Sequence, residues 1–206
     1  MVDKRVWGGV IFFLVFILVS WIWIKPIVLF LIFLLGCHII FFRDPQRRIP
    51  EGEAPVAPAD GEVVEISSVR EDRFLGEEAV KISIFLSILD PHVNRSPIQG
   101  NISYLHYQPG RFFNAMKPVS ARENQSNWIG IQKEKRKVLM RQITGAIAKR
   151  IFCDVELRQF VQKGEKVGII CYGSRAEFYA PKRFFQPTVR LGEKVKAGET
   201  MLGIWL

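Results

Sequence analysis

Residues 163–172 read Lys-Gly-Glu-Lys-Val-Gly-Ile-Ile-Cys-Tyr, a Gly-Glu turn followed directly by an apolar stretch rich in β-branched residues. The same turn returns at 191–198 as Leu-Gly-Glu-Lys-Val-Lys-Ala-Gly, and a related Ala-Asp-Gly-Glu-Val stands at 59–63. Glycine permits the positive φ of a tight hairpin turn, and β-branched residues favour strands. These three stretches therefore predict short strands joined by tight turns.

Similar short runs recur along the chain after residue 60, separated by Gly and Pro. We expect strands at Gly61–Ile66, Ala79–Leu86, Gly100–Tyr107, Trp128–Ile131, Val138–Ile143, Ile151–Val155, Lys166–Tyr172, Glu177–Tyr179 and Thr188–Leu191. Helical periodicity is weak, and the best helical candidate is the short segment around Ser87–Val93. The spacing is typical of a barrel or sandwich, and the repeated Gly-Glu turns resemble lipoyl- and biotinyl-type half-barrels. The expected fold is therefore mainly β, a barrel-sandwich or lipoyl-like domain.

The residues before this β region are almost entirely apolar. Between Val6 and Phe42, 30 of 37 positions are apolar, and Lys25-Pro26 divides the stretch into Val6–Ile24 and Ile27–Phe42. As helices these pieces would be about 28 and 24 Å long, against roughly 30 Å of hydrocarbon in a bilayer. We therefore expect a membrane-anchoring hydrophobic helical hairpin over 1–42, or a shallower insertion into one leaflet, followed by one domain over 43–206.

Basic residues flank this apolar stretch. Lys4 and Arg5 precede it, Arg43, Arg47 and Arg48 follow it, and a single lysine lies between its halves. The positive-inside rule places both flanks, and the domain with them, on the cytoplasmic face of the cell membrane. The formal net charge of +9 suits attraction to an anionic lipid surface. Nucleic acid is not an expected partner, because the basic runs lack a stacking pattern of aromatic residues.

A Gly-Ser pair stands in Cys171-Tyr-Gly-Ser-Arg-Ala-Glu177, and its serine is a candidate nucleophile. The stretch is not a G-x-S-x-G elbow, and a serine triad would also need a histidine. His92 and His106 are the only histidines outside the apolar region, so the sequence gives weak support to a serine hydrolase.

A different chemistry needs only Gly173 and Ser174. Attack of the hydroxyl on the glycine carbonyl turns the peptide into an ester, and elimination then breaks the chain and leaves a pyruvoyl group. That group can condense with an amine and accept electrons, as pyridoxal phosphate does.

Six stretches around this pair stand in a characteristic order. They are Phe41-Phe-Arg-Asp-Pro-Gln-Arg-Arg-Ile-Pro50, Ala57-Pro-Ala-Asp-Gly-Glu-Val63, Leu89-Asp-Pro-His-Val-Asn-Arg-Ser-Pro97, Gly110-Arg-Phe-Phe-Asn-Ala115, Gln142-Ile-Thr-Gly-Ala-Ile-Ala-Lys-Arg-Ile151 and Tyr172-Gly-Ser-Arg175. Together they resemble the short bacterial and archaeal (type A) form of the phosphatidylserine decarboxylase proenzyme family. The resemblance covers nearly the whole chain, including the apolar N-terminal region.

The resemblance implies that the precursor cuts itself between Gly173 and Ser174. The products would be a β chain, residues 1–173, and an α chain, residues 174–206, that form a heterodimer; further oligomerisation stays open. Ser174 would become the pyruvoyl cofactor, without metal or pyridoxal phosphate. Its ketone would form a Schiff base with the amine of phosphatidylserine, carbon dioxide would leave, and phosphatidylethanolamine would be released. Diacyl and archaeal ether lipids are not distinguished.

The resemblance also assigns roles to two further residues. His92 matches a histidine that transfers protons near the decarboxylation centre, and Asp60 matches an aspartate of self-processing. Their structural alternatives are a turn histidine and an Asp-Gly hairpin turn. Longer family members carry a second histidine that pairs with the aspartate, where this chain has Arg95. The base that activates Ser174 therefore stays open, with His106 as a spare candidate on a strand surface.

A membrane-tethered biotinyl- or lipoyl-like carrier or adaptor is the alternative function. Ala115-Met116-Lys117 resembles part of a biotin-attachment turn. Pro118 follows where the carrier motif has Met, and no second Gly-rich half stands at the right spacing. These departures weaken the carrier reading of Lys117.

Overall fold

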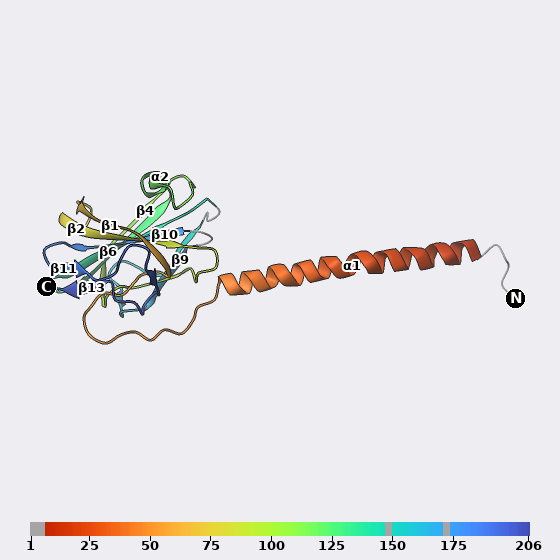
Figure 1. The fold of residues 1–206 in the computed structure, drawn as a ribbon, viewed down its shortest axis with the longest axis horizontal. Coiled ribbons are helices and arrows are strands. Elements are labelled where there is room, and N and C mark those ends of the chain that lie inside the picture. The colour runs from red at the N-terminus through yellow and green to blue at the C-terminus, as the bar shows by residue number, and fades with distance from the viewer. Residues whose placement is uncertain (1–6, 147–149, 171–173) are drawn as a thin grey trace. The chain divides into compact units, whose positions relative to one another are not determined.

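The computed structural model describes residues 7–146, 150–170 and 174–206. It divides into a helical unit that ends at Ile40 and a β unit that runs from Phe41 to Leu206 (Figure 1). Strands dominate the second unit, and its described residues contain one short helix, α2 (Pro118–Glu123). The expected fold class, a mainly β domain after an apolar N-terminal helical region, is confirmed.

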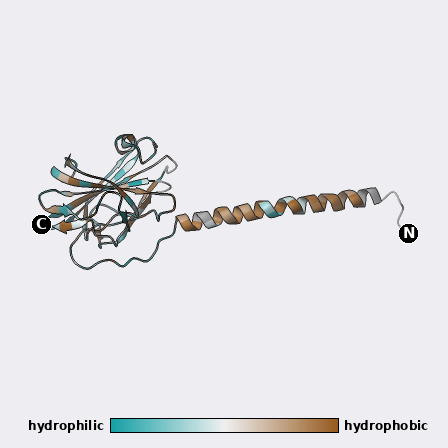
Figure 2. Ribbon diagram, viewed as in Figure 1, coloured by the Kyte–Doolittle hydropathy of each residue, from teal (hydrophilic) through white to brown (hydrophobic). Residues whose placement is uncertain are grey.

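The N-terminal unit is a single helix, α1 (Trp7–Phe41), of 35 residues. This differs from the expected hairpin, because the helix continues through Lys25-Pro26 instead of turning there. A proline inside a helix removes one hydrogen bond, but a helix satisfies its other backbone groups internally, so an apolar segment need not break at that point. By length and composition alone, residues Ile11–Phe41 are sufficient to cross a membrane, and Figure 2 shows their mainly hydrophobic character.

The β unit is built around one curled eight-stranded antiparallel sheet (Figure 1). Its order is β12 (Lys194–Val195), β1 (Gly61–Glu71), β2 (Glu77–Leu86), β10 (Ser174–Pro181), β6 (Arg136–Ile143), β5 (Ser126–Lys133), β4 (Gly100–Gln108) and β8 (Phe160–Val161). A three-stranded sheet joins β3 (Val93–Arg95), β9 (Lys166–Ile170) and β7 (Ile151–Cys153), and a pair joins β11 (Phe185–Pro187) to β13 (Gly203–Trp205).

Most of the expected strands are confirmed, and two local predictions are wrong. Thr188–Leu191 follows β11 as irregular chain, and the Ser87–Val93 segment forms a turn that leads into β3 instead of a helix. The last two residues of the expected strand Lys166–Tyr172 lie outside the described residues. Strands of two or three residues, such as β8 and β12, carry no periodicity of their own and exist because a longer strand pairs with them.

Alternate residues of β10 face the two sides of the sheet. Ala176 and Phe178 belong to the main core cluster, whereas Tyr179 belongs to a second cluster on the outer face. Because successive side chains of a strand point to opposite faces, Ser174 shares the core face with Ala176. The fold therefore directs the serine of the Gly-Ser pair toward the inside of the domain.

We predict that Phe178→Ala lowers the free energy of unfolding by about 3–5 kcal/mol, because it leaves a cavity in a core that cannot fully collapse. Phe178 has no exposed surface, and its ring lies 5.5 Å from that of Phe185. Denaturant unfolding of the full chain in detergent, followed by tryptophan fluorescence, measures the change. Phe184→Ala, at a side chain that is 42% exposed, is the matched control. A loss below about 1 kcal/mol for Phe178→Ala would contradict this account of the core.

Candidate active site

Ser174 is the first residue of β10, the strand that is hydrogen-bonded to β2 on one side and β6 on the other. It pairs with Leu86, the last residue of β2, and it has no exposed surface. Its Oγ has no hydrogen-bond partner among the described residues. Gly173 lies outside the described residues. A buried hydroxyl without a partner is costly, so such a group is a candidate for chemistry instead of packing.

His92 is also buried, with 1% of its surface exposed. Its neighbours determine which ring nitrogen carries the proton and whether the imidazole is charged. Its Nδ1 lies 2.7 Å from the carbonyl oxygen of Asp90, and its ring packs 4.2 Å from that of Phe41. A carbonyl only accepts hydrogen bonds, so Nδ1 carries the proton in this contact and leaves Nε2 as the basic nitrogen. Burial lowers the pKa of His92 to about 4, and the imidazole is therefore neutral at pH 7.

Backbone pairing places His92 and Ser174 at the same end of the domain. Leu86 lies opposite Ser174, and the backbone N–H of Ile170 donates to the carbonyl of His92 at 3.2 Å. Segment 87–92 therefore connects β2 of the large sheet with β3, and β9, which pairs with β3, precedes β10 along the chain. The histidine is the last residue of this connection, and the serine is the first residue of β10.

Asp60 precedes β1 and is held by a residue of the linker that follows α1. Both of its carboxylate oxygens lie 2.8 Å from Nη2 of Arg47, and both side chains are largely buried. Burial raises the pKa of Asp60 above its ordinary value, the Arg47 guanidinium opposes that rise, and the charge of Asp90 adds to it. The backbone N–H of Arg95 donates to the carbonyl of Pro58 at 2.9 Å, so the segment before Asp60 lies beside the strand that follows His92.

The other sequence candidates lie elsewhere. Arg95 donates to the carbonyl of Gly164 at 2.9 Å and pairs with Asp44, whereas Asp60 forms its ion pair with Arg47. His106 is exposed on β4, as its strand-surface reading predicted. Lys117 is exposed at the N-terminus of α2.

Sequence reasoning missed a chain of buried amide side chains. Asn127 Nδ2 donates to Gln142 Oε1 at 3.0 Å, Gln142 Nε2 donates to Asn94 Oδ1 at 2.8 Å, and Asn94 lies 3.5 Å from the carbonyl of Pro58. This chain connects β5, β6 and β3 with the loop before Asp60. A signal was available for Asn127 and Gln142, because each follows the alternation of core residues along its strand, where a polar group needs a partner. Asn94, in the three-residue strand β3, carried no such signal.

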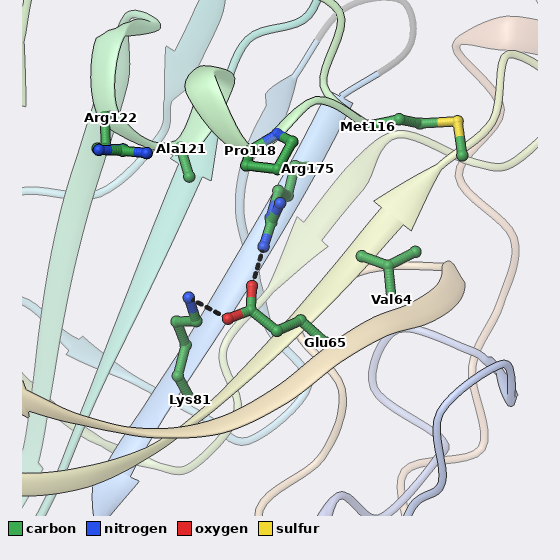
Figure 3. A pocket seen from close by; sticks show the side chains of 8 residues that line it. All are labelled: Val64, Glu65, Lys81, Met116, Pro118, Ala121, Arg122 and Arg175. Carbon is green, nitrogen blue, oxygen red and sulfur yellow. Dashed lines mark hydrogen bonds and ion pairs between the residues drawn. The ribbon is translucent and has the colours of Figure 1, made fainter.

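A network of charges lies on the outer face of the large sheet, on β1, β2, β10 and β6. Figure 3 shows Glu65 between Lys81, whose Nζ is 2.6 Å away, and Arg175, the residue after Ser174. These groups line a pocket of about 460 Å³ near α2. Arg175 also approaches Glu177, 3.2 Å away, which in turn pairs with Arg141. Removing one partner of a buried ion pair is strongly destabilising, so this network holds the start of β10 in one register.

We predict that the free energy of unfolding falls as the pH falls from about 6.5 to about 4, with His92 contributing up to about 3 kcal/mol. The folded-state pKa of His92 is about 4, so the unfolded chain binds the additional proton across this window. Stability must therefore rise with pH there. His92→Asn should remove this part of the pH dependence, as measured by denaturant unfolding at several pH values. His106→Asn on the exposed strand is the control, and an unchanged slope in His92→Asn would contradict the prediction.

Comparisons with known proteins agree with this arrangement. A family model described as phosphatidylserine decarboxylase matches residues 34–203. A protein of Carboxydothermus hydrogenoformans, named phosphatidylserine decarboxylase proenzyme, is 44% identical over 84% of this chain and 82% of its own length. Proteins of the same name from Nitrosomonas eutropha and Nitrosomonas europaea are 42% and 39% identical over 89% and 92% of this chain, and over 83% and 86% of their own lengths. On this evidence the chain belongs to the phosphatidylserine decarboxylase family.

Proposed function

We propose that the chain is a proenzyme that cuts itself between Gly173 and Ser174 and then decarboxylates phosphatidylserine to phosphatidylethanolamine with a pyruvoyl group derived from Ser174. The names of the relatives support the substrate and the precursor state. One structural observation carries the proposal. The Ser174 hydroxyl is buried and has no partner among the described residues, at the first position of a strand paired on both sides.

The proposed cleavage is a rearrangement followed by an elimination. Ser174 Oγ attacks the carbonyl carbon of Gly173, the C–N bond breaks, and an ester links the two residues. Loss of the Ser174 α-proton expels the Gly173 carboxylate and leaves dehydroalanine, which takes up water and releases ammonia to leave a pyruvoyl group. Asp60 is the proposed residue of self-processing, because its raised pKa makes the carboxylate a stronger base than an exposed aspartate.

The architecture supports retention of the small chain after the break. Residues 174–206 begin with β10, which pairs with β2 and β6, and β12 pairs with β1. β2, β6 and β1 all belong to residues 1–173. The two proposed chains would therefore stay together through backbone hydrogen bonds and a shared core, as a heterodimer.

Residues of this chain also support the proposed decarboxylation. A pyruvoyl carbonyl supplies an electron sink for a substrate that carries a primary amine. His92 is neutral, and we assign to its imidazole the transfer of the proton that replaces carbon dioxide. The buried positions of Ser174 and His92 exclude bulk water from the reacting atoms.

The apolar helix α1 and the basic linker after it support a place at the cytoplasmic face of the cell membrane, where an anionic phospholipid substrate would lie.

The two alternative functions, a biotinyl- or lipoyl-like carrier and a serine hydrolase, gain less support. Lys117 precedes a helix and does not stand at the tip of a hairpin, as a carrier lysine would. His92 Nδ1 lies against the backbone carbonyl of Asp90, whereas a serine hydrolase triad needs a carboxylate there.

We predict that the wild-type protein separates into residues 1–173 and 174–206 under denaturing conditions, and that Ser174→Ala stays one chain without decarboxylase activity. The alanine lacks the oxygen that attacks Gly173 and that later becomes the ketone. Intact-mass measurement of the denatured protein distinguishes the two patterns. Ser96→Ala, which alters another serine without exposed surface, should still be cut. A single, uncut and active wild-type chain would overturn the proposed function.

We predict that variants of Asp60 and His92 affect different steps. Asp60→Asn should slow self-cleavage at least about tenfold, whereas His92→Asn should lower the decarboxylation rate of the cut enzyme by about 10²–10⁴-fold, the usual contribution of a proton-transfer group. Gel time courses measure cleavage, and carbon dioxide released from carboxyl-labelled phosphatidylserine measures decarboxylation. Asp154→Asn at an exposed aspartate is the control. Equal losses of both steps in both variants would contradict the division of roles.

A further inference from the structure

The connection between β2 and β3 contains a tight turn with an apolar tip. The backbone N–H of Ser87 donates to Asp90 Oδ2 at 2.8 Å, and the backbone N–H of Asp90 donates to the Ser87 carbonyl at 3.0 Å. These bonds close the turn and leave Ile88 and Leu89 at its tip, 52% and 77% exposed. Turn tips usually carry Gly, Asn, Asp or Ser, so two adjacent large apolar side chains at this position indicate a surface with a partner.

This turn lies where α1 enters the β unit. Nη2 of Arg43 donates to the carbonyl oxygen of Leu89, and the ring of Phe41 packs against His92. Phe41 is the last residue of α1, and all of these contacts lie within the β unit. The end of the apolar helix is therefore fixed beside the turn, whatever direction the helix takes. A bilayer that holds α1 up to Phe41 would reach the domain at Leu89.

The same turn leads directly to the candidate active site. Leu89 is three residues from His92, so their Cα atoms are at most about 11 Å apart. Leu86, which stands just before the turn, pairs with Ser174. The head-group layer on each side of a bilayer is roughly 5–8 Å thick. A Leu89 side chain at the hydrocarbon boundary would therefore place His92 within about 11 Å of that boundary, in the head-group layer or directly beside it.

We propose that the Ile88–Leu89 turn inserts into the surface of an anionic phospholipid bilayer beside the end of α1 and places lipid head groups at the site. The inference rests on the proposed function, because it assigns the route by which a bilayer-embedded substrate reaches Ser174 and His92. The apolar tip supplies contact with acyl chains, and the Arg43 guanidinium at the base of the turn supplies attraction to anionic head groups. The turn is therefore a membrane contact that is separate from the helix itself.

The test compares two forms of one substrate. The full chain is assayed on phosphatidylcholine vesicles that contain phosphatidylserine, and on dibutanoyl phosphatidylserine dissolved as monomers. Leu89→Ser should lower the vesicle rate at limiting substrate about tenfold, the order expected for losing one buried leucine contact, and leave the rate on the monomeric lipid within about twofold. Leu89→Phe should keep the vesicle rate. Leu191→Ser, at an exposed leucine in a different turn, should change neither rate.

Three results would overturn the proposal. Equal losses on both substrates in Leu89→Ser would show that the turn acts on the site itself, and an unchanged vesicle rate would show that the tip does not contact lipid. Conversion of an oligomer to a monomer by Leu89→Ser, without a loss specific to vesicles, would identify a second copy of this chain as the partner.

A second measurement separates this proposal from the proposed function. An environment-sensitive dye is attached at Leu89→Cys, with Cys37, Cys153 and Cys171 replaced by Ser, and its quenching by nitroxide lipids is measured. Strong quenching at position 89 and little at a matched Leu191→Cys site would support insertion, even if the wild-type chain decarboxylated neither substrate. Equal quenching at the two positions would overturn insertion, whatever the activity.

Discussion

The two-sided pairing of β10 with β2 and β6 is the constraint on which the rest of the molecule depends. It places Ser174 at the start of a strand whose eight residues are all buried. One face of the strand packs into the core through Ala176 and Phe178, and the other carries the ion pair between Arg175 and Glu65. A reactive residue at this place has a fixed backbone and is shielded from bulk water. Its strand would stay hydrogen-bonded to β2 and β6 if the chain were cut before it.

The linker after α1 has a second organising role, because it connects the membrane-type helix to the site. Contacts at the end of α1 and in this linker join Phe41 to His92, Arg43 to Leu89, Asp44 to Arg95 and Arg47 to Asp60. Four residues within seven positions thus contact the candidate site or its supporting loop. An enzyme whose substrate is a membrane lipid benefits from such an arrangement, because the segment that would hold it at the bilayer also shapes the site.

The larger strands could be predicted from sequence because their apolar and polar residues alternate with the period of a half-buried strand. The failures have local physical causes. Ser87–Val93 contains apolar residues at spacings that suit a helix, but Asp90 closes a turn with Ser87 instead. Lys25-Pro26 looks like a turn signal, yet the apolar residues on both sides allow one helix to continue. The shortest strands exist only because longer strands provide their partners.

The sequence by itself determined the apolar N-terminal region, the mainly β domain and Ser174 as a candidate nucleophile, since composition, strand periodicity and a Gly-Ser pair are local properties. Asp60 and His92 became candidates through the resemblance to a family. Only the tertiary structure decided what surrounds those residues. It gave Asp60 a partner in Arg47, buried His92 beside Phe41, and joined distant strands through Asn127, Gln142 and Asn94. These contacts depend on which strands lie side by side, and strand order comes from long-range pairing that no single stretch of sequence encodes.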